Sequence, residues 1–191
     1  MQLVALLAAS CTGDATTTDS DEAEATSAAA PEQPYAGWQA RPISALDPEL
    51  VDDLIAGRGA GYALSAELNS YPGPTQVLMM ATELSLTVEQ EASVQDIFDA
   101  MQPEAQTLGR DLLDLEANLD EQFRNSSITY AMLEQLTSEI SVVDGQLRAA
   151  HLAAHLDVTA LLFKEQVDKY DELRGYSGES GAMDNSPHNM E

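Results

Sequence analysis

The hydrophobic positions of this chain follow a helical pattern over two long segments. Apolar side chains recur three or four residues apart in both, as they do along one face of an α-helix. In the first segment, about residues 88–124, they are Ile97, Met101, Ala105, Leu108, Leu112, Leu115, Leu119 and Phe123. After a polar turn at residues 125–127, the second segment has Leu133, Leu136, Ile140, Val143, Leu147, Ala150, Ala154, Val158 and Leu161. Because the turn is short, we expect the two helices to pack as an antiparallel hairpin.

Local signals indicate where helices begin. Thr87 and Gln90 have the spacing of a capping box, in which the Thr hydroxyl accepts from a free helix amide and the Gln side chain reaches back to the cap. Asp47 and Pro48 are typical of an N-cap and the first helical position, so a shorter helix is expected to begin there. Pro103 predicts a kink or a local break inside the first long helix.

Further short helices complete the pattern. Glycines at positions 57, 59 and 61 end the helix that begins at residue 48, and other helices are expected at about residues 62–68, 75–84 and 164–173. No segment alternates β-branched and polar residues as a half-buried strand does. The sequence therefore predicts an all-α fold, a long antiparallel helical hairpin with shorter helices packed around it.

Acidic residues far outnumber basic ones, which limits the classes of partner that the chain is expected to bind. The 191 residues include 33 Asp and Glu but 8 Lys and Arg, for a formal charge of -25. Nucleic acid is not expected as a partner, because phosphate binding needs Lys and Arg to displace counterions. The single Cys excludes an internal disulfide framework and a cysteine-based zinc site. The negative charge has two interpretations, a functional surface or a means of keeping the chain soluble.

Composition divides the chain into four parts. Residues 1–11 resemble the end of a bacterial lipoprotein signal, with an apolar run and small residues before Cys11, the residue that would be lipidated. The alternative is a cytosolic protein in which Cys11 is a small buried side chain. Residues 12–34 carry six acidic and no basic residues and predict a disordered tether. Residues 35–176 are the predicted all-α domain, and residues 177–191 are expected to form a disordered polar tail.

Two motifs within the helical region resemble those of a known family. Leu86-Thr87-Val88-Glu89-Gln90 has the LTxxQ pattern of the Spy/CpxP family of periplasmic proteins, which has a second copy near its C-terminus. Leu162-Phe163-Lys164-Glu165-Gln166 lies at that place, with Phe163 where the pattern has Thr. The order of a long helix, a polar turn, a long helix and a short helix is also similar to this family. The resemblance covers about residues 45–176.

The resemblance implies a curved all-α cradle, usually a homodimer, in the bacterial periplasm. Members of the family act as ATP-independent chaperones, as envelope-stress regulators, or as heavy-metal sensors and binders, and none is an enzyme. Our first hypothesis is therefore a holdase that binds unfolded or misfolded envelope proteins, with Cys11 as its lipid anchor.

Flexible apolar side chains would suit the binding of such clients. Met79, Met80 and Met101 are the candidate client-binding residues, because Met adapts to partners of varied shape. The alternative is that these residues fill gaps in the core. The acidic charge of the domain favours basic clients, or clients bound mainly through apolar contacts.

The second hypothesis is a site for a divalent metal such as zinc, copper or nickel. His151 and His155 are four residues apart, which places both imidazoles on one helix face within reach of a single ion. The alternative is that both are surface residues beside an interface.

Catalytic chemistry is not expected. Carboxylate pairs such as Asp52-Asp53 and Asp120-Glu121 arise by chance in so acidic a chain, and adjacent residues point to different helix faces. The sequence also lacks the Glu-x-x-His motif with which helix bundles hold paired metals.

Overall fold

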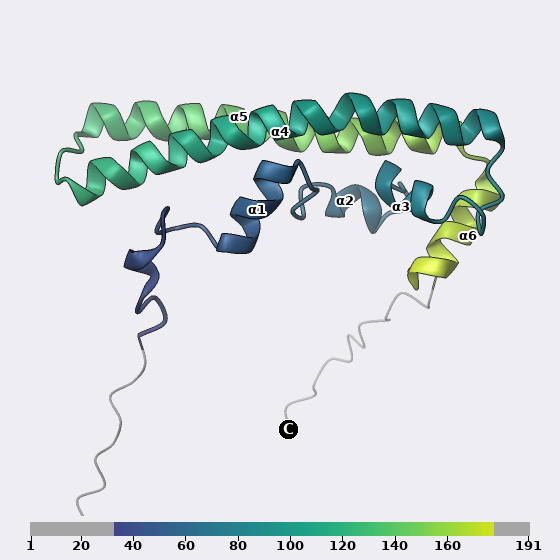
Figure 1. Ribbon diagram of the computed structural model, residues 1–191, viewed down its shortest axis with the longest axis horizontal. Helices are drawn as coiled ribbons and strands as arrows, with labels where there is room; N and C mark the ends of the chain where they lie inside the picture. The colour runs from purple at the N-terminus through teal and green to yellow at the C-terminus, as the bar shows by residue number, and fades with distance from the viewer. Residues whose placement is uncertain (1–32, 178–191) are drawn as a thin grey trace, which may run out of the picture. The chain divides into compact units, whose positions relative to one another are not determined.

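A computed structural model describes residues 33–177 of the chain. These residues form six α-helices and a short 3-10 helix, without a β-strand, so the predicted all-α fold class is confirmed (Figure 1). The 3-10 helix spans Trp38–Ala40. It is followed by α1 (Pro48–Ala56), α2 (Leu64–Glu67), α3 (Pro74–Met79), α4 (Val88–Arg124), α5 (Tyr130–Leu161) and α6 (Lys164–Arg174).

The hairpin of α4 and α5 is the framework of this part of the chain. The two helices have 37 and 32 residues, which at 1.5 Å per residue makes them about 55 and 48 Å long. They pack side by side along their length (Figure 1). Ser126 adopts a left-handed φ of 53° in the turn that joins them. α4 is one continuous helix through Pro103, so the break that this residue could have produced does not occur.

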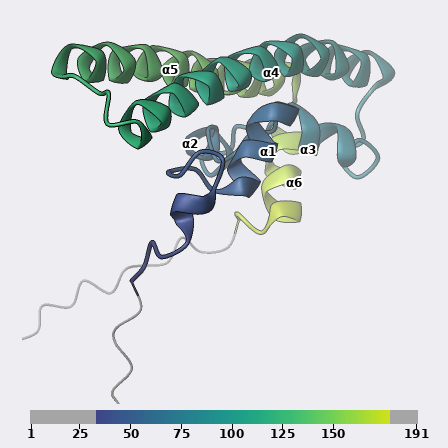
Figure 2. The same cartoon turned by 60° about the vertical axis from the view of Figure 1, so that its left-hand side comes forward.

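The short helices pack along one side of the hairpin (Figure 2). α1 contacts α4, α2 contacts α5, and α3 contacts both long helices. α1 begins where the sequence predicts, because the Asp47 side chain accepts a hydrogen bond of 2.9 Å from the Glu49 amide. α2 and α3 are shorter than predicted. The chain after Met79 leaves the helix for turns, in which Ser85 has a left-handed φ of 51°.

The core consists of two apolar clusters at different places along the hairpin. One lies where α1 crosses α4 and contains Ile43, Leu54, Ala105, Leu112, Leu113 and Leu147. The other lies where α3 and α6 meet the open end of the hairpin and contains Val77, Leu84, Val94, Val158, Leu162 and Tyr170. No helix between residues 33 and 177 combines the length and the apolar character that crossing a bilayer requires.

Candidate functional site

The two copies of the LTxxQ-like motif meet in the structure. Gln90 at the start of α4 and Gln166 at the start of α6 are both buried, and their side-chain amides bond to each other in both directions, at 2.8 and 3.0 Å. Each amide also bonds to backbone: Gln90 donates to the Leu161 carbonyl at 2.9 Å, and Gln166 donates to the Leu84 carbonyl at 3.2 Å. This pair of glutamines therefore ties together the starts of two helices and the end of a third.

The capping roles of the two motif copies differ. Thr87 and Gln90 form the complete capping box, because the Thr hydroxyl accepts from the Gln90 amide and the Gln side chain accepts from the Thr87 amide, both at 3.1 Å. At the second copy the Gln166 side chain accepts from the Phe163 amide at 2.9 Å. The Phe ring has no acceptor atom to return the contact. The structure thus keeps half of the box at this copy.

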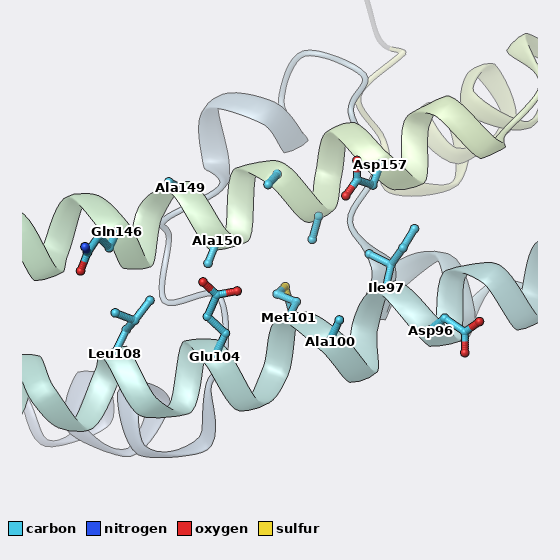
Figure 3. Close-up of a pocket in the computed structure, with 12 residues that line it drawn as sticks. Asp96, Ile97, Ala100, Met101, Glu104, Leu108, Gln146, Ala149, Ala150 and Asp157 are labelled. Carbon is cyan, nitrogen blue, oxygen red and sulfur yellow. The ribbon is translucent and has the colours of Figure 1, made fainter.

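An open groove lies between α4 and α5, on the opposite side of the hairpin from α1–α3. It has a volume of about 750 Å³ (Figure 3). α4 contributes Asp96, Ile97, Ala100, Met101, Glu104 and Leu108, and α5 contributes Gln146, Ala149, Ala150, Ala153, Ala154 and Asp157. Figure 3 shows the larger apolar side chains on α4 facing a row of short ones on α5.

The groove exists because small residues line one of its walls. Four of the six α5 residues in the groove are alanines, so the side chains between the two helices do not fill the space above the seam. The groove's only charged residues are Asp96, Glu104 and Asp157, which we call the acidic rim. The groove therefore combines an apolar floor with negative charge, and none of the described helices covers it.

No protein-family model, curated protein or solved structure matches this chain.

The three candidate methionines have different environments. Met101 is buried at the floor of the groove, and Met80 is partly buried against the apolar cluster of α3 and α6. Met79 is 77% exposed at the end of α3 and does not line the groove. Of the three, only Met101 lines the groove.

The candidate metal ligands are buried on the other side of α5, against the loops that flank α2. Nδ1 of His155 lies 2.7 Å from the Tyr71 carbonyl oxygen, so this nitrogen carries the proton and donates it. The ring of His151 stacks on Tyr62, with centroids 6.1 Å apart, and its Nε2 has no hydrogen-bond partner among the described residues. Burial, and secondarily the nearby His155, lower the pKa of His151. Neither histidine is the surface residue that the alternative interpretation expected.

The described residues add no further ligands to this histidine pair. Between residues 33 and 177, no three His, Cys, Asp or Glu side chains are arranged to hold a metal ion. Cys11, the signal-like residues, most of the predicted tether and the tail from residue 178 lie outside the described residues.

Two polar clusters were not anticipated from the sequence, one partly buried around Tyr62 and one around the buried Glu67. The Tyr62 hydroxyl donates to Asp144 at 2.7 Å, and burial together with this bond raises the pKa of Tyr62. Burial and the Asp144 carboxylate also raise the pKa of Glu116. In the second cluster, Glu67 accepts hydrogen bonds from the C-terminal residues Tyr170, Arg174 and Tyr176 at 2.6, 3.1 and 3.1 Å. The first cluster links the loop before α2 to α5 by a hydrogen bond, and the second links α6 to α2 in the same way.

Proposed function

We propose that this chain is a holdase of the Spy/CpxP type, which binds exposed segments of unfolded proteins in the bacterial envelope. The observation that carries the proposal is the open groove between α4 and α5, with its apolar floor and acidic rim. A segment that covers this floor gains about 25 cal/mol for each Å² of apolar surface removed from water. The resemblance of residues 1–11 to a lipoprotein signal and the two LTxxQ-like motifs support the envelope location.

The groove suits capture that is rapid and reversible. The acidic rim attracts positively charged segments and raises their rate of association, while apolar contacts at the floor stabilise the complex. Such binding needs no nucleotide and no covalent step. Folding of the client buries the same apolar residues that the groove would hold, so the folded client is released.

Aggregation of denatured proteins tests this function. The full chain is added to a chemically denatured basic protein and to a denatured acidic one, and light scattering is followed after dilution. We expect suppression near equimolar ratio, stronger for the basic client. The variant Ala149→Gln with Ala153→Gln places two longer polar side chains in the groove and is expected to lose most of the suppression.

The matched control is Ala92→Gln with Ser141→Gln, at exposed positions of the same two helices that do not line the groove. Circular dichroism checks that both double variants keep the helix content of the parent. The proposal is wrong if the parent suppresses the aggregation of neither client, or if the groove variant suppresses it as well as the control does.

A further inference from the structure

The hairpin has a further hollow nearer its turn, beyond the part drawn in Figure 3. A second hollow, of about 340 Å³, is lined by Leu115, Ser138, Glu139, Val142 and Val143. Leu115 follows Leu108 by seven residues on α4, and Val142 precedes Ala149 by seven on α5. Seven residues are nearly two helical turns, so both hollows open on the same face of the hairpin. Together the two hollows span about 27 Å of α4, from Ile97 to Leu115.

Backbone hydrogen bonding favours a helix as the occupant of this groove. Both walls are α-helices, whose backbone amides and carbonyls already bond within the helix. An extended segment would find no strand edge to pair with, and its own buried backbone groups would lose their partners. A helix satisfies its backbone internally. At 1.5 Å per residue, about 18 residues of helix match the length that the two hollows span.

The small residues of α5 favour the same occupant. Packed helices approach to about 8–10 Å between their axes, and the smallest distances need small side chains at the contact. Ala149 and Ala153 are exposed and Ala150 is partly buried, so a third helix resting on α5 would meet short side chains over slightly more than one turn. The larger side chains of Ile97 and Leu108 on α4 would pack against its other flank.

Charge determines which helix fits. Asp96, Glu104 and Asp157 line the main groove and Glu139 lines the second hollow, whereas neither hollow is lined by Lys or Arg from the described residues. A second copy of the chain docked groove to groove would bring the same carboxylates against each other, because a two-fold contact pairs a surface with itself. Lysines or arginines beside an apolar stripe would instead meet the carboxylates.

From these observations, and resting on the holdase function proposed above, we infer that the preferred client is a cationic amphipathic α-helix. It docks along the α4–α5 groove as a third helix, with its apolar stripe on the alanines and its basic residues at the carboxylates.

Labelled model peptides test the inference by fluorescence anisotropy with the full chain. The first probe is an 18-residue helix of Leu and Lys with one apolar stripe. The second has the same charge but two central Leu replaced by Pro, and the third has Glu in place of Lys. We expect the Leu/Lys helix to bind and to gain helical circular dichroism. The other two peptides should bind about tenfold more weakly or not at all. Added NaCl should weaken the binding of the Leu/Lys helix.

A triple variant tests whether the acidic rim receives the peptide. Asp96→Asn, Glu104→Gln and Asp157→Asn together should weaken binding of the Leu/Lys helix about tenfold, since each exposed charge pair contributes modestly. The control triple is Asp99→Asn, Asp114→Asn and Glu121→Gln. It makes the same change in net charge at exposed positions of α4 that do not line the groove, and it should bind like the parent.

Each contrary result has a definite meaning. Equal binding of the Pro-containing peptide overturns the helical client, and equal effects of the two triple variants overturn the docking site. A dimer in sedimentation that dissociates only in the groove variant assigns the groove to a second copy and also overturns the inference. Suppressed aggregation without peptide binding removes the helical client but leaves the holdase function. Peptide binding without suppressed aggregation removes the holdase function and leaves a helix-docking groove.

Discussion

Gln90 and Gln166 join the starts of α4 and α6 through amides that each donate to and accept from the other. Replacing Gln90 by Glu keeps the shape of the side chain but removes its donor. The Leu161 carbonyl then loses its side-chain donor, the Gln166 side-chain oxygen keeps only the Phe163 amide, and a carboxylate is buried beside that oxygen. Each buried polar group left without a partner costs about 1–3 kcal/mol. We therefore expect Gln90→Glu to lower the free energy of unfolding by about 2–4 kcal/mol in urea denaturation.

Gln95→Glu is the control, because Gln95 lies on the same helix with an exposed side chain. Its effect should remain within about 0.5 kcal/mol, as for most surface substitutions. If Gln90→Glu were as stable as this control, the amide pair would have no structural importance and the motif would serve only as a cap.

At the scale of the elements, a glycine sets how closely α1 approaches α4. Gly109 lies in the middle of α4 and is buried, and a Cβ at this position would collide with the Leu54 carbonyl of α1. Gly145 in α5 is also helical, but a Cβ there would meet nothing within 4 Å. We expect Gly109→Ala to destabilise the fold by about 1–3 kcal/mol, because α1 must move away. Gly145→Ala should stabilise it by about 0.5–1 kcal/mol, because Ala is the better helix former.

Urea denaturation of both alanine variants compares the same substitution in two environments. Equal stabilisation by both would mean that α1 does not rest on α4 at Gly109. In that case the first apolar cluster of the core would have a different arrangement.

The helices themselves could be predicted because their signals are local. Thr87 marks the start of α4, the turn after Arg124 marks its end, and the apolar period of both long helices indicates a hairpin. The role of Gly109 could not be predicted in this way. A glycine inside a helical pattern indicates only a weak helix former, and its contact depends on where a helix fifty residues earlier in the chain is placed.

The candidate site could be predicted only in part from such local signals. The spacing of His151 and His155 correctly places them on one helix face. The loops that bury this face contain Tyr62 and Tyr71, which are far away in the sequence. The groove was missed for a related reason. Ala149 and Ala153 lie outside the predicted apolar stripe, and small side chains give a weak hydrophobic signal even where they create an open surface.

For the molecule as a whole, repulsion between carboxylates should outweigh the attraction of its ion pairs. Residues 35–176 contain 24 acidic and 8 basic residues. The ion pairs among the described residues lie largely at the surface, as Arg58–Asp53 and Arg148–Asp144 do, where such pairs contribute about 0–1 kcal/mol each. Most carboxylates of α4, which has ten acidic and two basic residues, have no positive neighbour to offset them.

Salt should therefore stabilise the fold. Raising NaCl from about 20 mM to about 500 mM shortens the Debye length below the spacing of many of these carboxylates, which weakens their repulsion. We expect the Tm, measured by circular dichroism, to rise by a few degrees, because about 1 kcal/mol corresponds to 2–4 °C in a domain of this size. The triple variant Asp99→Asn, Asp114→Asn and Glu121→Gln removes part of the repulsion and should be more stable than the parent at low salt, with a smaller response to NaCl. A Tm that falls as NaCl is added would mean that the ion pairs dominate. The high negative charge would then not be a net cost to the stability of the fold.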